Sequence, residues 1–162
     1  MIYVVPVPAK LGQLPLGWNL RMLQLGFVHQ SNGQSDPLSR SWNRITLGAG
    51  LEHGGFSIQI RDNQRIRAHG KDDNPDLVEY IGRGEVNLAW SQGTSTFGAT
   101  WRTNYNALNR GSLQFDFTYP VFSDQPTGLR WYVQLFHGYG ETMLDYNHSQ
   151  TSLGLGLTLF QF

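Results

Sequence analysis

Apolar and polar residues alternate with a period of two along most of this chain. In positions 43–52, one series of alternate residues is mostly apolar and the intervening residues are small or polar. Successive side chains of a β-strand point to opposite faces, so this pattern predicts strands with one apolar and one polar face. The same alternation recurs in positions 56–61, 85–90, 113–119 and 153–159.

Two all-β architectures produce this alternation, and they differ in where the apolar face lies. A soluble sandwich buries that face, whereas a membrane-spanning barrel turns it outward to lipid. Composition does not separate the two. The second face favours the barrel, because it is rich in glycine and carries charges that suit a polar lumen. Its charged residues are Arg44, Glu52, Arg61, Glu79, Arg83, Glu85, Asp116 and Arg130.

We therefore predict an all-β, antiparallel, up-and-down transmembrane β-barrel over residues 17–162, and we leave residues 1–16 unassigned. About eight strands are expected, and their ends are uncertain by about 2–4 residues. The expected strands are 17–31, 41–53, 55–62, 78–91, 94–104, 112–120, 129–138 and 151–162.

The connections between these strands also point to an outer-membrane protein. Bacterial outer-membrane barrels combine long extracellular loops with short periplasmic turns. The long links, 32–40, 63–77, 105–111 and 139–150, all fall on one side of the sheet, whereas those near 54 and 92–93 are short and 121–128 is intermediate. The chain ends on Phe160 and Phe162, which resembles the C-terminal aromatic signal of bacterial outer-membrane proteins. An ordinary amphipathic last strand is the alternative.

Charge and composition exclude several other classes of protein. The 162 residues include 12 basic and 12 acidic side chains, so nothing points to a nucleic-acid partner. The absence of cysteine excludes thiolate zinc sites, a cysteine nucleophile and disulfides. No run of about 18 apolar residues occurs, which excludes a transmembrane helix. The N-terminus lacks the pattern of a signal peptide, so we expect either a fragment or a true start further upstream.

One segment, residues 26–44, carries the chemistry. His29 and Ser31 are two apart, so they share a face of a strand. A turn-rich loop follows, and pairing of the two strands about it places positions whose numbers sum to about 72 opposite each other. Asn43 then faces His29, with Cβ atoms about 4.5–5.5 Å apart.

That arrangement matches what a serine hydrolase needs. A serine hydroxyl requires an adjacent base, imidazole titrates in the right range, and a neutral amide can fix the tautomer of the ring. By itself the pattern is common. The alternative is that His29, Ser31 and Asn43 are polar surface residues of a hairpin without a catalytic role.

The same segment resembles the catalytic signature of the outer-membrane phospholipase A family, H-x-S-N-G followed by S-D-P-x-S-R-S-W-N-R. The matching residues are His29, Ser31, Asn32, Gly33, Ser35, Asp36, Pro37, Ser39, Arg40, Ser41, Trp42, Asn43 and Arg44. Two further patches, 72–76 and 138–147, resemble the acidic loop and the last extracellular loop of that family. The resemblance extends from Gly17 to the C-terminus.

The resemblance implies calcium-dependent hydrolysis of acyl esters of glycerophospholipids in the bacterial outer membrane. Ser31 would be the nucleophile, His29 the general base and Asn43 the residue that orients it. These three side chains would face outward to lipid, near the long-loop end of the barrel and toward the outer leaflet. The family also implies that a homodimer forms on activation.

A calcium site is implied close to this triad. Its ligands would be the side chain of Ser39, the backbone carbonyl of Gln34 and a further group from a partner subunit. Gly33 is the candidate oxyanion donor, and Asp36 with Asp73 would form a second, acidic calcium position. Oxygen ligands suit Ca²⁺, although the two aspartates also read as ordinary turn residues.

The chain departs from the family pattern in two ways. Gln34 stands where the family often has a basic residue, which a backbone ligand tolerates. The family barrel has about twelve strands, and only about eight are expected here, so we predict a sheet that is open along one side. The alternatives to an enzyme are a passive outer-membrane barrel, such as a porin or adhesin, and an inactive fragment of the phospholipase.

Overall fold

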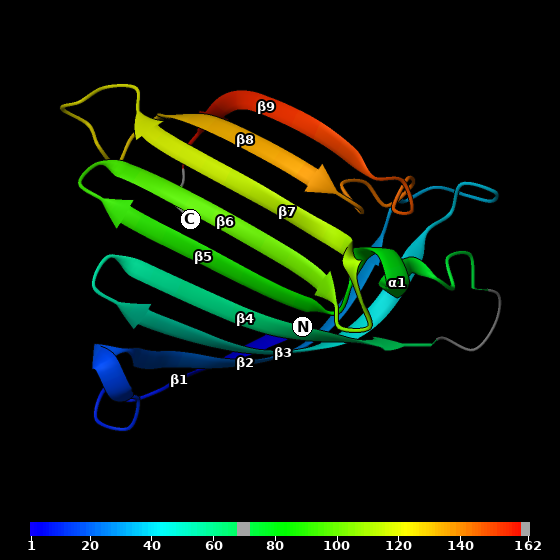
Figure 1. Cartoon of the computed structure of the whole chain (residues 1–162), viewed down its shortest axis with the longest axis horizontal. Coiled ribbons are helices and arrows are strands. Elements are labelled where there is room, and N and C mark those ends of the chain that lie inside the picture. Colours follow the sequence, from blue (N-terminus) through cyan, green and yellow to red (C-terminus); the bar gives the residue numbers. More distant parts are fainter. Residues whose placement is uncertain (68–71, 160–162) are drawn as a thin grey trace.

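The computed structural model describes residues 1–67 and 72–159, and in them it forms a single sheet of nine antiparallel strands (Figure 1). Each strand pairs with the next one along the chain, which is the predicted up-and-down order. The strands are β1 (Ile2–Pro6), β2 (Asn19–Ser31), β3 (Ser41–His53), β4 (Phe56–Ile66), β5 (Gly84–Gln92), β6 (Ser95–Asn104), β7 (Ala107–Pro120), β8 (Arg130–Gly138) and β9 (Gln150–Thr158). A 3-10 turn, η1 (Pro15–Gly17), and one short helix, α1 (Leu77–Ile81), complete the described elements.

The first strand, β1, lies in the segment that the sequence left unassigned. It pairs with β2 from Ile2 opposite Gly26 to Pro6 opposite Met22. All five of its residues are exposed. Its sequence, IYVVP, has no period-two alternation and ends in proline, so the pattern used for the other strands did not find it.

Two other local predictions differ from the structure. Residues 78–81, expected at the start of the strand 78–91, lie in α1, because Leu77 is buried against Trp42 and Tyr146. The expected long link at 105–111 is a turn at 105–106, since β7 already begins at Ala107. Phe160 and Phe162, the proposed terminal signal, lie outside the described residues.

The apolar face of the sheet points outward, as predicted for a membrane barrel. Leu25, Leu47 and Leu155 are exposed by 54%, 53% and 77%. Among the described residues only four large apolar side chains are buried, Trp42, Leu77, Phe136 and Tyr146. A soluble sandwich would instead bury most of this face. No helix in the described part of the chain is long and apolar enough to cross a membrane.

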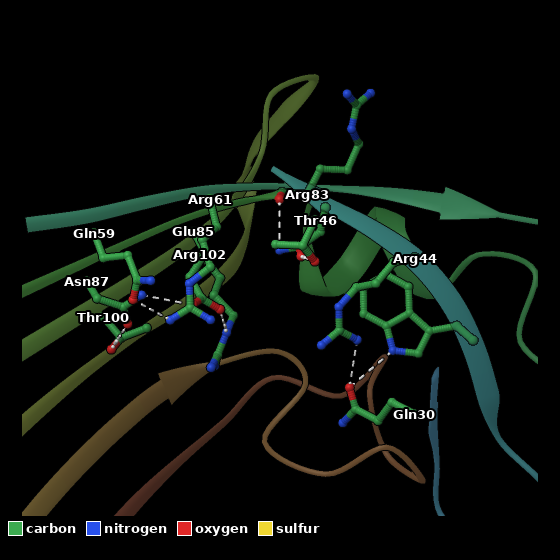
Figure 2. A network of polar contacts seen from close by, with 12 residues as sticks. Gln30, Arg44, Thr46, Gln59, Arg61, Arg83, Glu85, Asn87, Thr100 and Arg102 are labelled. Atoms are coloured by element: carbon green, nitrogen blue, oxygen red, sulfur yellow. Dashed lines mark hydrogen bonds and ion pairs between the residues drawn. The ribbon is translucent and has the colours of Figure 1, made fainter. Parts of the chain in front are cut away.

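The concave face of the sheet carries a network of polar contacts (Figure 2). Arg61 and Arg102 lie 3.3 and 2.9 Å from the carboxylate of Glu85. Further along, the Thr46 hydroxyl donates to Asn63 over 2.8 Å. Paired charges and satisfied amides are what a polar barrel interior requires.

The sheet is open, as expected. In the described residues β1 pairs only with β2, and β9 pairs only with β8. Consequently β2 and β9 do not meet, and two strands keep unpaired edges. Unpaired backbone groups in hydrocarbon cost several kcal/mol each.

One buried arginine ties together the short connections at the end of the sheet opposite the long loops. Arg130 is 0% exposed. Its guanidinium donates to the Thr118 hydroxyl at 3.0 Å, to the Pro126 carbonyl at 2.7 Å and to the Thr94 carbonyl at 2.5 Å. It therefore joins the β5–β6 turn to the β7–β8 connection.

Arg130→Ala should lower the free energy of unfolding by about 3 kcal/mol, because it leaves several buried acceptors without a donor. Denaturant unfolding in detergent measures this. Arg21→Ala is the matched control: its pair with Glu52 is about half exposed on both sides, and its loss should cost less than about 1 kcal/mol. Equal effects of the two substitutions would contradict the role assigned to Arg130.

Candidate active site

The β2–β3 hairpin positions the predicted catalytic residues. His29 pairs with Asn43, and Ser31 pairs with Ser41, which confirms the predicted register. The side chains of His29 and Asn43 also meet, with 2.9 Å between Nδ1 and Oδ1. Because an amide oxygen only accepts hydrogen bonds, the proton of the neutral ring is on Nδ1 and the lone pair is on Nε2. That tautomer is the one a general base needs.

Ser31 lies on the same outward face as this pair. His29 and Ser31 are both exposed, and the neighbouring positions of that face are the apolar residues Phe27 and Ile45. Within residues 1–67 and 72–159, the structure gives the Ser31 hydroxyl no hydrogen bond to His29. Catalytic hydrogen bonds often tighten only when substrate binds. The structure thus joins two members of the triad directly and holds the third in line with them.

Asn32 closes the loop that follows Ser31. Its Nδ2 donates to the Leu38 carbonyl at 2.7 Å, and its Oδ1 accepts from the amides of Arg40 at 3.0 Å and Gln34 at 3.3 Å. Its backbone amide donates to the Arg40 carbonyl at 3.0 Å. Sequence reasoning placed Asn32 in the turn and in the family motif without giving it a role, and the Asn-Gly pair was the signal that could have identified this one.

The candidate oxyanion donor follows Asn32 directly. Gly33 has a φ of 69°. An added Cβ would meet no atom within 4 Å, so the backbone conformation, and not lack of space, favours glycine here. Gly33 lies two residues after Ser31, within the loop that Asn32 closes.

The predicted calcium residues lie in two loops at the same end of the sheet. Gln34, Asp36 and Ser39 belong to the loop 32–40, where Ser39 is partly buried and the other two are exposed. Asp73 lines a small pocket together with Asn43 and Arg65. Among the described residues the structure forms no cluster of three or more His, Asp or Glu side chains, so it does not assemble Asp36 and Asp73 into such a group.

The donor chemistry of the loop nevertheless fits a hard cation. The Ser39 hydroxyl and the Gln34 backbone carbonyl can each coordinate a metal ion through oxygen. In the described part of the chain, neither oxygen takes part in a hydrogen bond. Calcium takes oxygen ligands of these types in flexible geometry. The residues present are thus compatible with the calcium position that the resemblance implies.

The second matching patch, 72–76, supports the hairpin. Asn74 is 1% exposed, and its Oδ1 accepts from the Ser41 amide at 3.3 Å. Arg65 holds this loop in place through the Asn74 carbonyl at 2.7 Å and the Asp72 carboxylate at 2.7 Å. The loop therefore supports the first residue of β3, opposite Ser31. Sequence reasoning matched this patch to the acidic loop of the family and gave Asp73 a calcium or turn role, but it assigned no support of β3 to Asn74.

The third matching patch covers the inner side of the same hairpin. Tyr146 packs with Trp42 and Leu77 in the largest apolar cluster of the described residues. Its hydroxyl donates to Asp76. Burial, followed by this hydrogen bond, raises the pKa of Tyr146 to about 12, so the phenol stays protonated and the contact persists at neutral pH.

An antiparallel meander with apolar side chains outside and paired charges inside is the architecture of an outer-membrane β-barrel protein. Within that class the chain belongs to the phospholipase A1 family, whose model matches residues 1–159. The chain is a protein of the bacterial outer membrane, as are relatives of known structure.

Individual relatives agree with this assignment. A putative phospholipase A1 of Neisseria meningitidis is 42% identical over 93% of this chain and 38% of its own length. Phospholipase A1 of Salmonella typhimurium is 36% identical over 88% of this chain and 47% of its own length. The crystal structure of the Salmonella typhi outer-membrane phospholipase dimer with bound calcium superposes with a TM-score of 0.84 at 32% identity, covering 96% of this chain and 57% of the other. The chain thus spans half, or less, of the curated relatives it matches.

Asn32→Ala should release the loop 32–40. It removes three side-chain hydrogen bonds, and the loss of about 1 kcal/mol from one of them alone raises local opening several-fold. Hydrogen exchange followed by mass spectrometry should show the Arg40 amide exchanging about tenfold faster. Asn32→Asp keeps the acceptor and should show a smaller change. Unaltered exchange in Asn32→Ala would remove the role given to this side chain.

Proposed function

We propose that this protein hydrolyses acyl ester bonds of glycerophospholipids through Ser31, His29 and Asn43. The observation that carries the proposal is the His29–Asn43 hydrogen bond, 2.9 Å long, on the outward face beside Ser31. Polar side chains exposed to hydrocarbon are costly and are usually functional. The family membership supports the same chemistry.

The proposed mechanism uses the tautomer described above. Nε2 of His29 takes the proton of the Ser31 hydroxyl as Oγ attacks the ester carbonyl carbon. The resulting oxyanion accepts a hydrogen bond from the Gly33 amide. His29 then gives the proton to the leaving glycerol oxygen, and an acyl-enzyme remains on Ser31. His29 then takes a proton from water as the water oxygen attacks the acyl carbon, and returns that proton to Ser31 Oγ as the fatty acid leaves. Asn43 holds the imidazole in place throughout.

The location of the site favours a lipid substrate. The triad lies on the face that carries the exposed side chains of Phe27 and Leu47, near the loop end of the sheet. We infer that this end faces the outer leaflet, so that acyl chains of membrane phospholipids lie against the strands and their ester groups reach Ser31.

We also propose a calcium ion and a homodimer for the active form. Ser39 and the Gln34 carbonyl would hold the ion near the oxyanion, and Asp36 with Asp73 would form a second position. Bound there, Ca²⁺ would supply positive charge to the developing oxyanion. The solved Salmonella typhi relative is a dimer with bound calcium, which supports both parts of the proposal. A partner subunit would supply a further ligand.

Ser31→Ala should abolish phospholipid hydrolysis while leaving the β-sheet content unchanged. Loss of an activated nucleophile lowers kcat by a factor on the order of 10⁶. Asn43→Ala should retain more activity, because Asn43 only orients His29. Fatty-acid release from mixed micelles measures turnover, and circular dichroism checks the fold. Near-normal turnover in Ser31→Ala would mean that the barrel is passive or that another residue attacks.

Chelation should stop turnover, and Ca²⁺ should restore it better than Mg²⁺. Magnesium demands a tighter octahedral site and gives up its water reluctantly. Calorimetry gives a second readout: Ser39→Ala should weaken Ca²⁺ binding about tenfold or more, whereas Ser35→Ala in the same loop should leave it unchanged. Full activity in excess chelator would reject a catalytic calcium ion.

A further inference from the structure

The catalytic hairpin has a second set of side chains on its inner face, directly behind the triad. Gln30 lies between His29 and Ser31 on β2, and Trp42 and Arg44 flank Asn43 on β3. Because successive side chains of a strand alternate, these three point inward where the triad points outward.

A single oxygen joins the three inner side chains. Oε1 of Gln30 accepts from Arg44 Nη1 at 2.9 Å and from Trp42 Nε1 at 3.3 Å. The Arg44 guanidinium carbon also lies 4.3 Å from the centroid of the Trp42 ring. Figure 2 shows Arg44 reaching Gln30 across the hairpin. Each strand is therefore held to the other through the residues that flank the catalytic pair.

This inner set is itself anchored to the rest of the molecule. Trp42 is only 6% exposed and packs against Leu77 of α1 and Tyr146 of the last long loop. Gln30 and His29 are both exposed, and the side chains of His29 and Asn43 are joined to each other by one hydrogen bond. The inner side chains therefore add a restraint to the backbone pairing and loop contacts that already hold this end of the hairpin.

The position in the strands makes such support necessary. The last pairs of the hairpin are His29 with Asn43, Gln30 with Trp42 and Ser31 with Ser41. Strand ends adjoining long loops open most readily. Catalytic geometry tolerates displacements of only about 0.5 Å, and a misplacement of about 1 Å can cost a hundredfold in rate.

We propose that Gln30, Trp42 and Arg44 form an inner clamp that positions His29 and Asn43 for catalysis. They are positioning residues, since they face away from the site of reaction. The proposal rests on the proposed hydrolase function, and it predicts that damage to the clamp lowers kcat and leaves KM unchanged. The bonds of Gln30 would act through the backbone register and through the orientation of the two strands.

Gln30→Leu tests the clamp in the purified protein with Ca²⁺ present. It removes the shared acceptor at similar size, and kcat should fall by roughly 10-fold to 100-fold with KM unchanged within about twofold. Gln30→Glu keeps an acceptor oxygen and should retain most of the activity. Gln24→Leu is the matched control, because Gln24 lies on the same face of β2 and its Oε1 accepts a hydrogen bond from Gln59 Nε2 at 3.0 Å, away from the triad.

A nuclear magnetic resonance measurement tests the positioning of His29 independently of turnover. In protein with ¹⁵N-labelled histidine, the Nδ1 proton that His29 shares with Asn43 should exchange with water about tenfold faster in Gln30→Leu. Ser31→Ala should leave that exchange rate unchanged while abolishing turnover.

The results distinguish a failure of the proposed hydrolase function from a failure of the inner clamp. Turnover that persists in Ser31→Ala overturns the proposed function, and the His29 proton still reports on the clamp. A Gln30→Leu protein with kcat within twofold of the parent and unaltered proton exchange overturns the clamp. So does an equal loss of kcat in Gln24→Leu, since that would mean a general loss of fold.

Discussion

The backbone pairing of β2 with β3 is the interaction on which the rest of this site depends. It runs through twelve residue pairs, from Asn19 with Glu52 to Ser31 with Ser41. Because side chains alternate along a strand, a slip of one residue would turn His29 inward and Gln30 outward. One register therefore places the triad on the lipid side and its polar support on the other side.

That register is strongly specified, because the two faces of the sheet tolerate opposite residues. A one-residue slip of β2 would turn Leu25 toward the polar face that carries Arg61 and Glu85, and would turn Gln24 and Gln30 toward hydrocarbon. Polar groups in lipid and apolar groups among unsatisfied amides are both costly. The pairing of charges inside the sheet and the catalytic geometry outside it are thus consequences of the same constraint.

Much of this arrangement could be predicted from the sequence, because it depends on local rules. Alternation in positions 43–52 and 113–119 indicated strands and their faces, and the spacing of His29, Ser31 and Asn43 about a turn-rich loop indicated the register. The elements that were missed depend on tertiary contacts. The short strand Ile2–Pro6 lies at an edge without alternation, and α1 is formed where Leu77 is buried under Tyr146. No local pattern reveals that Asn74 bonds to Ser41 across 33 residues.

The loops at this end of the sheet show why so much of the matching sequence surrounds a site of three residues. Asn32 closes the first loop through four hydrogen bonds, Asn74 fixes the start of β3, and Tyr146 covers Trp42 from the inner side. A serine exposed on the outside of a barrel has no surrounding cleft to orient it. Its orientation must come instead from contacts along the backbone of its own hairpin and from the face behind it. These supporting contacts do not cover the outward face, because every one of them lies within the sheet, in the loops or on the concave face. The lipid side stays open along the strands, and in the proposed function that openness gives a substrate already in the membrane access to Ser31.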